Sequence, residues 1–172
     1  MYYGEIKKCD IANGIGTRVS LFVSGCRNRC KNCFNEATWD FCYGEEFTTD
    51  TENEIIKYLE PEYIHGLTVL GGEPFEPENQ KDLLPFLEKV RKTYPDKTIW
   101  IFSGFTLEEL QGVSRAKTEY TERILNLVDV LVDGRYDESK RNISLKFRGS
   151  ENQRLINMPD TLKSAKIVLW GE

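Results

Sequence analysis

Short apolar runs that alternate with helical patterns restrict the fold of this chain more than any other feature. Four such runs cover residues 19–23, 67–70, 98–102 and 128–132. Strands that alternate with helices predict a parallel sheet joined by helical crossovers, and uninterrupted apolar runs are typical of strands whose sheet is covered by helices. The sequence therefore predicts an α/β fold with a mostly parallel sheet.

The segments between these runs carry helix signals. Two have the form of a capping box, in which the first and fourth residues cap the start of a helix. A longer helical pattern precedes residue 95, and Pro85 within it predicts a kink or a late start. The capping boxes are predicted at Thr51 to Glu54 and at Thr106 to Glu109. A further helix is predicted near residues 119–127 and a final strand over residues 165–170.

Each of the four runs is followed by polar or glycine-rich residues. In open parallel sheets, ligands bind beyond the carboxyl ends of the strands. We therefore expect these residues to meet on one edge of the sheet and to form a binding site. In chain order they are a cysteine loop at residues 26–33, Gly71-Gly72-Glu73-Pro74, Ser103-Gly104 and Asp133-Gly134-Arg135.

The cysteine loop has the spacing C-x-x-x-C-x-x-C, with Cys26, Cys30 and Cys33 and no fourth cysteine in step. Thiolates are soft ligands that suit zinc and iron–sulfur clusters. Tetrahedral zinc or a fully ligated four-iron cluster takes four protein ligands. Three ligands leave one metal position open, and an open position is where a substrate or cofactor binds.

A zinc site is the main alternative for these thiolates. It would need Cys42, Cys9 or His65 as the fourth ligand. Otherwise Cys9 and Cys42 are expected to be small, semi-buried hydrophobic residues, and His65 a surface or packing residue. Disulfides are not expected in a reducing compartment.

The other motifs at the predicted edge suit a polar ligand. Glycines at 71 and 72 allow positive φ and close backbone approach, and Glu73 offers a carboxylate to an ammonium group. Asp133 suits ribose hydroxyls or a cation, and Arg135 suits a carboxylate. Ser103, Asp133 and Arg135 are equally consistent with plain turns at strand ends.

The length and net charge of the chain restrict the classes of protein to which it can belong. A chain of 172 residues is long enough for one domain and short for two. The net charge of −5 argues against a nucleic-acid substrate. No apolar run approaches the ~18 residues that span a bilayer, and the N-terminus lacks a signal-peptide pattern. We expect a cytoplasmic protein with no membrane partner.

Several motifs together carry a resemblance to a known family. The cysteine loop followed by Gly-Gly-Glu-Pro resembles the radical S-adenosylmethionine (SAM) superfamily. Residues 13–18, Asn-Gly-Ile-Gly-Thr-Arg, are similar to the entry motif of glycyl-radical-enzyme activases. Residues 33–39 and the tail at 147–156 resemble the activating proteins of anaerobic ribonucleoside-triphosphate reductases. The resemblance runs over nearly the whole chain.

The resemblance implies a cofactor and a ligand set. Cys26, Cys30 and Cys33 would hold a [4Fe-4S] cluster, and SAM would chelate its open iron. The turn at Gly71, Gly72 and Glu73 would receive the SAM amino group, with Ser103, Asp133 and Arg135 as further candidates for the ribose and carboxylate. Many superfamily members place an aromatic residue before the third cysteine, against the adenine. This chain has Asn32 there and Phe34 after Cys33, and both are candidates for that contact.

The implied activity is radical activation of a protein. Reductive cleavage of SAM gives methionine and a 5′-deoxyadenosyl radical, which takes a hydrogen from a glycine in the large subunit of the anaerobic reductase. An electron donor such as flavodoxin is implied. A full (β/α)₈ barrel takes ~250 residues, so residues 1–172 are expected to form a single activase domain with a partial, laterally open (β/α) barrel.

Two other classes of function fit part of the sequence. The same chemistry could serve another glycyl radical enzyme of the formate-lyase type, or a small molecule as in short deazapurine-forming enzymes. A zinc-stapled interaction module would explain the cysteines, but not the Gly-Gly-Glu-Pro turn or the entry motif.

Overall fold

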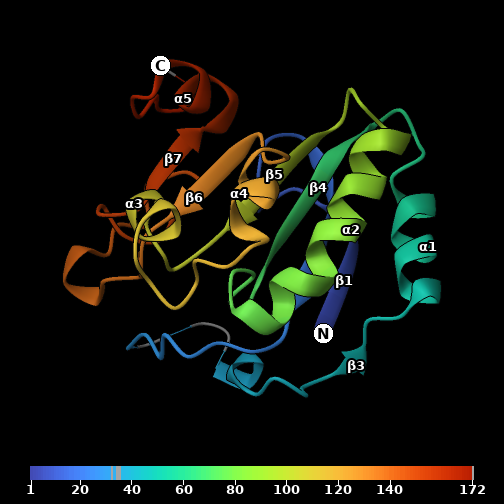
Figure 1. The fold of residues 1–172 in the computed structure, drawn as a ribbon, viewed down its shortest axis with the longest axis horizontal. Helices are drawn as coiled ribbons and strands as arrows, with labels where there is room; N and C mark the ends of the chain where they lie inside the picture. Colours follow the sequence, from blue (N-terminus) through green and yellow to red (C-terminus); the bar gives the residue numbers. More distant parts are fainter. Residues whose placement is uncertain (32, 34–35, 172) are drawn as a thin grey trace.

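The computed structural model describes residues 1–31, 33 and 36–171 of the chain. Within them, seven strands form one sheet in the order β3-β1-β2-β4-β5-β6-β7 (Figure 1). The strands are β1 (Tyr2–Asp10), β2 (Thr17–Val23), β3 (Glu45–Glu46), β4 (Ile64–Gly71), β5 (Thr98–Phe102), β6 (Val130–Asp133) and β7 (Arg154–Asn157). The helices are α1 (Thr49–Tyr58), α2 (Pro77–Thr93), α3 (Leu107–Gln111), α4 (Thr121–Leu125) and α5 (Met158–Ser164), with 3₁₀ turns η1 (Glu36–Trp39) and η2 (Glu138–Lys140).

The centre of the sheet is parallel. Strands β2, β4, β5 and β6 pair side by side in one direction. Strands β1 and β7 run antiparallel to β2 and β6, and β3 pairs antiparallel with β1. The predicted α/β class and mostly parallel sheet are confirmed. The sheet ends at β3 and β7 and is open, so it does not by itself confirm the predicted partial barrel.

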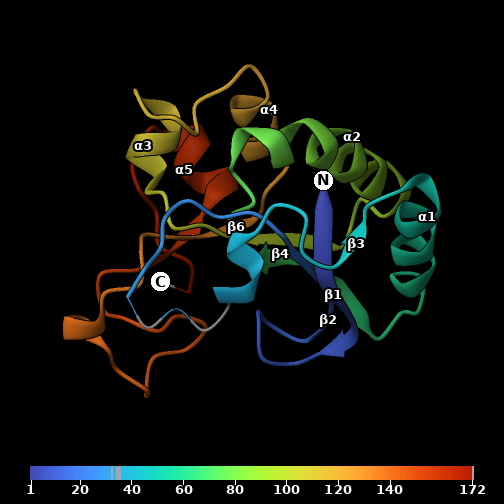
Figure 2. The same cartoon turned by 90° about the horizontal axis from the view of Figure 1, so that it is seen from below.

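The two faces of the sheet are covered differently. Figures 1 and 2 show α1, α2 and α4 along one face, where Leu21 of β2 and Val69 of β4 belong to the main hydrophobic core. On the other face, the Trp100 ring of β5 packs edge-on against Phe147 and Trp170, with ring centroids 5.3 Å apart in both pairs. This second face is therefore covered by loops and the C-terminal segment rather than by α1, α2 and α4.

A buried arginine holds the entry-motif loop against the second face. Arg18 of β2 is fully buried, and its Nε donates to Thr68 Oγ1 of β4 at 2.9 Å. Its Nη1 donates to the Ile15 carbonyl at 3.1 Å, and Thr68 Oγ1 donates to the Asn13 carbonyl at 2.7 Å. These bonds tie the loop between β1 and β2 to the sheet and place Asn13 beside the site described below.

Some of the predicted strands and helix starts agree with the structure and others differ from it. The predicted strands at 19–23, 67–70 and 98–102 are confirmed, and the fourth lies at Val130–Asp133. The capping box at Thr106 and Glu109 is confirmed. The box predicted at Thr51 to Glu54 is wrong, because Thr48 caps α1 and Thr51 is its reciprocal partner. The predicted late start at Pro85 is also wrong, because α2 already begins at Pro77.

The ends of the chain differ most from the sequence prediction. β1 was not predicted because it is an edge-side strand of mixed polarity, with most of its residues partly or fully exposed. Of the strand predicted at residues 165–170, the structure has only an isolated antiparallel bridge between Leu169 and Ile156 of β7. The last strand of the sheet is β7, which pairs with β6, and Ala165 ends α5 in a left-handed conformation (φ +58°). Among the described residues, no helix is both long and apolar enough to cross a membrane.

Candidate cluster and cofactor site

A cavity of about 440 Å³ lies at the carboxyl ends of the parallel strands, on the sheet face that also carries Trp100. Leu70, Phe102 and Val132, from the ends of β4, β5 and β6, form part of its lining. All four predicted motifs meet around it. Their lining residues are Cys26, Cys30, Cys33, Gly71, Gly72, Glu73, Ser103, Gly104 and Gly134.

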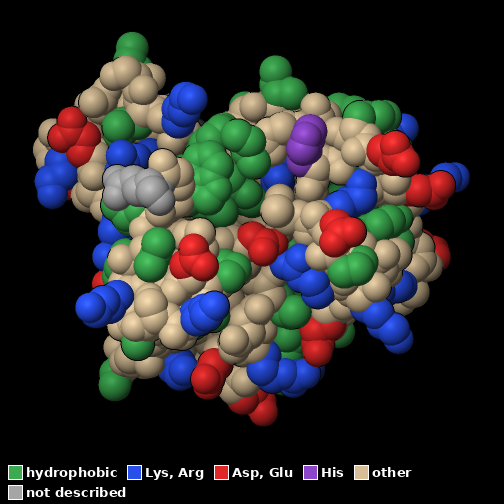
Figure 3. Space-filling model, turned by 90° about the horizontal axis from the view of Figure 1, so that it is seen from above, with side chains coloured by type: hydrophobic (Ala, Val, Ile, Leu, Met, Phe, Trp, Pro, Cys, Tyr) green, Lys and Arg blue, Asp and Glu red, His purple; other side chains and the backbone are tan. Residues whose placement is uncertain are grey.

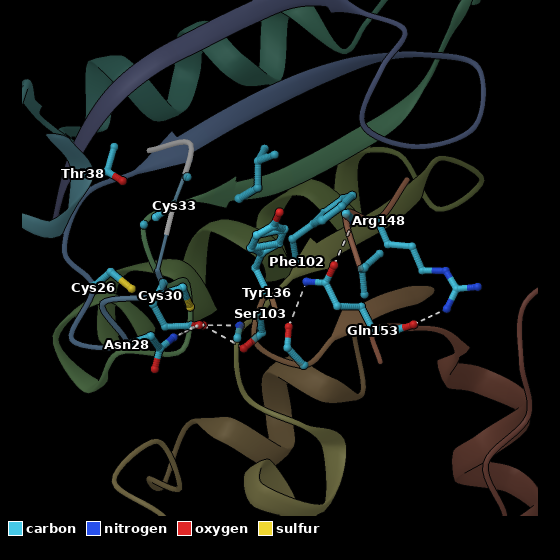
Figure 4. Close-up of a pocket in the computed structure, with 18 of the residues that line it drawn as sticks. Cys26, Asn28, Cys30, Cys33, Thr38, Phe102, Ser103, Tyr136, Arg148 and Gln153 are labelled. Atoms are coloured by element: carbon cyan, nitrogen blue, oxygen red, sulfur yellow. Dashed lines mark hydrogen bonds between the residues drawn. The ribbon is translucent and has the colours of Figure 1, made fainter. Parts of the chain in front are cut away.

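The cysteine loop forms one wall of the cavity. Figure 4 shows Cys26, Cys30 and Cys33 close together on this wall, and all three are half-buried. Gly25 begins the loop with φ +100°, and its N–H donates to the Thr38 carbonyl of η1 at 2.6 Å. A Cβ on Gly25 would lie 2.3 Å from the Phe41 ring, so this entry to the loop needs glycine.

Nearby backbone groups favour the thiolate form of two cysteines. The backbone of Asn28 and Arg29 lowers the pKa of Cys26, and the backbone of Tyr136 lowers the pKa of Cys30. Burial nevertheless raises the pKa of the Cys26 thiol to about 11 and raises the pKa of Cys30. A bound metal reverses this preference, because it deprotonates a coordinating thiol. The loop therefore fits a cluster whose positive metal ions offset the thiolate charge.

The three cysteines do not fit a single zinc ion. In the described part of the chain, no three His, Cys, Asp or Glu side chains converge closely enough to hold one metal ion. Thiolates at the corners of a four-iron cluster bind different irons, so they need no common point. Three thiols on one wall beside open space match that arrangement.

The three residues considered as a fourth zinc ligand do not line the cavity. His65 is at the start of β4, where its Nδ1 accepts from the Thr17 N–H at 3.1 Å. Figure 3 shows this histidine at the surface of the molecule. Cys9 lies near the end of β1, beside the start of β2. Cys42 is exposed and does not line the cavity.

Glu73 links three of the loops around the cavity. Its side chain is buried (1% exposed) and accepts four hydrogen bonds. Oε1 accepts from Gly104 N at 2.7 Å and from Asn28 Nδ2 at 3.0 Å, and Oε2 accepts from Ser103 Oγ at 2.8 Å and from Phe75 N at 2.9 Å. Burial raises the pKa of Glu73 to about 7. Figure 4 shows the bonds from Asn28 and Ser103 converging on this carboxylate.

Glycines allow these loops to approach closely. Gly71 has φ +109°, which favours glycine. A Cβ on Gly72 would lie 2.7 Å from the Gly25 carbonyl oxygen, and one on Gly104 would lie 2.4 Å from Asn28 Nδ2. Both glycines thus permit direct contact between the cysteine loop and the loops that follow β4 and β5.

Asp133 and Arg135 are engaged outside the cavity lining. Asp133 is fully buried and accepts from the Leu107 N–H at 2.8 Å and from Arg154 Nε at 3.0 Å. Arg135 pairs with Glu109 at 3.1 Å. Neither side chain lines the cavity, but the charge of Arg135 still acts on Cys30, whose pKa it lowers against the larger opposite effect of burial. Asn32 and Phe34 lie outside the described residues.

Sequence reasoning missed a second buried carboxylate that holds the cysteine loop. Glu76 is fully buried at the N-cap of α2 and accepts from the Arg27 N–H at 2.6 Å. Arg115 Nε donates to Glu76 at 3.1 Å, and Arg115 Nη2 donates to Asn28 Oδ1 at 3.0 Å. No local pattern signals this network, because its members come from distant parts of the chain.

The tail also contributes to the cavity. Its lining includes Phe147, Arg148, Gly149 and Gln153. Figure 4 shows Arg148 and Gln153 on the side away from the cysteine loop. The resemblance at residues 147–156 was the signal that could have placed this segment at the site.

Replacing Asp133 by asparagine is expected to destabilise the fold by about 2 kcal/mol. Asparagine keeps one acceptor for the Leu107 N–H or for Arg154, but it removes the charge that pairs with Arg154. Denaturant unfolding of the metal-free protein measures this effect. A variant of unchanged stability would show that the buried pair does not anchor β6 to β7. Arg123→Gln, in an exposed pair with Glu88, is the control and should change stability by less than about 1 kcal/mol.

Comparison with known proteins connects this geometry to a family. A family model described as a 4Fe-4S single cluster domain matches residues 12–156. A protein of Pasteurella multocida is 41% identical over 155 residues, which cover 89% of this chain and 95% of that protein. A protein of Enterobacteria phage T4 is 37% identical over 160 residues, covering 93% and 96%. Both relatives are named anaerobic ribonucleoside-triphosphate reductase-activating protein.

The chain belongs to this family of activating proteins. A relative from Haemophilus influenzae, 41% identical over 89% of this chain and 96% of its own length, carries the same name. The region matched by the 4Fe-4S family model includes the cysteine loop, the turn after β4 and most of β7. The match thus covers every wall of the cavity.

Proposed function

We propose that this chain activates an anaerobic ribonucleoside-triphosphate reductase by generating a glycyl radical on its large subunit, and that residues 1–172 act as one activase domain. The observation that carries the proposal is a single cavity shared by Cys26, Cys30 and Cys33 and by the turn at Gly71 to Glu73. Family membership supports the iron–sulfur cluster and names the reductase as the target of the relatives.

In this proposal the three cysteines hold a [4Fe-4S] cluster, and SAM occupies the adjoining space. The cluster, when bound, supplies the electron that cleaves SAM to methionine and the 5′-deoxyadenosyl radical that removes a glycine hydrogen. The protein contributes binding, orientation and exclusion of side reactions. The half-buried thiols and the backbone groups that favour their thiolate form suit a ligand loop of this kind, because the surroundings of the sulfurs and their solvent exposure set cluster potentials.

The residues of the turn after β4 act on the SAM methionine group. Gly71 and Gly72 leave room for close backbone approach, and Glu73 places a carboxylate at the cavity wall beside an incoming ammonium group. Ser103 orients Glu73 through its hydroxyl, which donates to Oε2. Asp133 supports this wall indirectly, through its bond to Leu107, and Arg135 through its pair with Glu109.

The proposed radical chemistry requires two protein partners, a reductase and an electron donor. A glycine-bearing segment of the reductase must reach the cavity, and a partial, laterally open barrel would admit it on the sheet face that lacks α1, α2 and α4. The proposed electron donor is a reduced carrier such as flavodoxin. A cytoplasmic setting suits both, since the cysteines must stay reduced to bind the cluster.

Electron paramagnetic resonance (EPR) tests the function directly. The protein is reconstituted with iron and sulfide without oxygen, then mixed with SAM, a reductant and the purified reductase. The expected result is a glycyl radical signal on the reductase, with about one methionine formed per radical. A formate-lyase-type enzyme replaces the reductase in the control and should give no signal. A signal only with that enzyme would contradict the proposed partner, and SAM cleavage without any cluster would contradict the proposed chemistry.

A further inference from the structure

Arg115 lies in the segment between α3 and α4, and its side chain reaches the cysteine loop. The neighbouring Ala116 is fully buried, and its carbonyl accepts from Gln80 Nε2 of α2 at 2.7 Å and from Thr121 Oγ1 at 2.9 Å. The Arg115 guanidinium packs over the buried Phe105 ring, 4.7 Å from the ring centroid. These contacts restrict where the guanidinium can lie.

Glu76 holds the same guanidinium from a second side. Arg115 Nε donates to Glu76 Oε1 at 3.1 Å, and Arg115 Nη2 donates to Glu76 Oε2 at 3.3 Å. The Glu76 side chain is fully buried, whereas that of Arg115 is 39% exposed. A guanidinium that binds both oxygens of one carboxylate has a fixed orientation. Arg115 is therefore oriented before any ligand enters the cavity.

The side-chain amide of Asn28 lies between this arginine and Glu73. Arg115 Nη2 donates to Asn28 Oδ1 at 3.0 Å. At the other end of the amide, Asn28 Nδ2 donates to Glu73 Oε1 at 3.0 Å, the bond drawn in Figure 4. Asn28 belongs to the cysteine loop, and both Asn28 and Glu73 line the cavity. Three side chains from separate loops thus form one hydrogen-bonded series that ends at the cavity wall.

Arg115 and Glu73 together select one orientation of the Asn28 amide. The amide accepts at its oxygen and donates at its NH₂ group. With the amide turned over, the oxygen would face the Glu73 carboxylate and the NH₂ group would face the guanidinium, so both hydrogen bonds would be lost. The amide also packs directly on Gly104, where a Cβ would lie 2.4 Å from Nδ2. Arg115 therefore holds the NH₂ group of Asn28 toward Glu73.

We propose that Arg115 is a positioning residue for SAM binding, which holds the Asn28 amide and through it the Glu73 carboxylate at the cavity wall. The inference rests on the proposed role of Glu73 in binding the SAM ammonium group. It gives the segment between α3 and α4 a part in the site, although Arg115 itself does not line the cavity. Without Arg115, Asn28 can turn, and SAM must order both side chains when it binds. That ordering costs affinity, and we expect a loss of about tenfold.

The first test needs no cluster. The metal-free protein is labelled with ¹⁵N-asparagine, its side-chain NH₂ signals are recorded by nuclear magnetic resonance, and the pair that disappears in Asn28→Ala is assigned to Asn28. Arg115→Ala should move this pair toward the signals of solvent-exposed asparagines. Arg27→Gln is the matched control, because it removes a second guanidinium from Glu76 and keeps both partners of the Asn28 amide. It also keeps the backbone N–H that Glu76 accepts, and the Asn28 pair should stay in place.

The second test is anaerobic equilibrium dialysis of SAM against the reconstituted protein. Arg115→Ala and Asn28→Ala should each bind SAM about tenfold more weakly, with the iron content of the wild type. The double variant should bind no more weakly than Asn28→Ala alone, because Arg115 acts through Asn28 and the two losses do not add. Arg27→Gln should bind SAM like the wild type.

Two results would overturn the inference. One is an unmoved Asn28 pair in Arg115→Ala, and the other is a double variant in which the two losses of affinity add. If Arg115→Ala holds less iron than the wild type, the signal of the metal-free protein decides the outcome. A wild-type protein that holds its cluster and binds no SAM would instead contradict the proposed function, and the Asn28 signal is independent of that result.

Discussion

Cys30→Ala is expected to eliminate cluster-dependent activity. Cys30 is the middle of the three proposed ligands and lies on the cavity wall. Without it only two thiolates remain on that wall, and two ligands do not retain a four-iron cluster that needs three protein thiolates and an open iron. Iron content, visible absorbance and SAM cleavage measure the loss, which should be complete within detection for cleavage and for the glycyl radical.

The control for this variant is Cys42→Ala. Cys42 is exposed, lies beyond η1 and is absent from the cavity lining. It should retain the iron content and SAM cleavage of the wild type. A Cys30→Ala protein that still produces a glycyl radical on the reductase would refute the assignment of the cysteine loop.

Glu73→Ala is expected to destabilise the metal-free protein by about 3 kcal/mol, because it leaves four hydrogen-bond donors around a buried position without their acceptor. Two of these donors are backbone N–H groups, from Gly104 and Phe75, which cannot move far. The loops after β2, β4 and β5 should separate, so SAM binding to the reconstituted protein should weaken as well. Denaturant unfolding and equilibrium binding measure the two effects.

Two further variants separate the loss of hydrogen-bond acceptors at Glu73 from the loss of a surface carboxylate. Glu73→Gln should cost less stability, because its carbonyl oxygen keeps one pair of donors. Glu88→Gln alters a carboxylate that pairs with Arg123 at the exposed surface, and it should change stability by less than about 1 kcal/mol. Equal stability of Glu73→Ala and the wild type would show that the carboxylate does not hold the loops together.

The local patterns predicted the scaffold of the site well. Apolar runs and helix signals reported the central strands, since burial of a parallel strand requires continuous apolar residues. The rule that ligands bind at the carboxyl ends of such strands then brought Cys26, Glu73 and Ser103 to one edge, and the structure places all three in one cavity. β1 escaped prediction because its mixed, largely exposed sequence lacks that pattern.

The roles of Asp133 and Arg135 could not be predicted in the same way. Both follow β6 as expected, but a side chain at a strand end can turn into the cavity or away from it. Asp133 turns to Arg154 and the start of α3, and Arg135 turns to Glu109. Which partner a charged side chain takes depends on the packing of loops that are distant in the chain.

The sequence by itself determined the parallel sheet, the close spacing of the three cysteines, and the edge of the sheet at which they lie. These depend on residue type and short spacing, which local chemistry restricts strongly. Only the tertiary structure decided that Glu73 and Glu76 hold the cysteine loop, and that the Asp133 and Arg135 side chains pair with Arg154 and Glu109. Those contacts join residues from separate loops, and their geometry exists only once the sheet has brought the loops together.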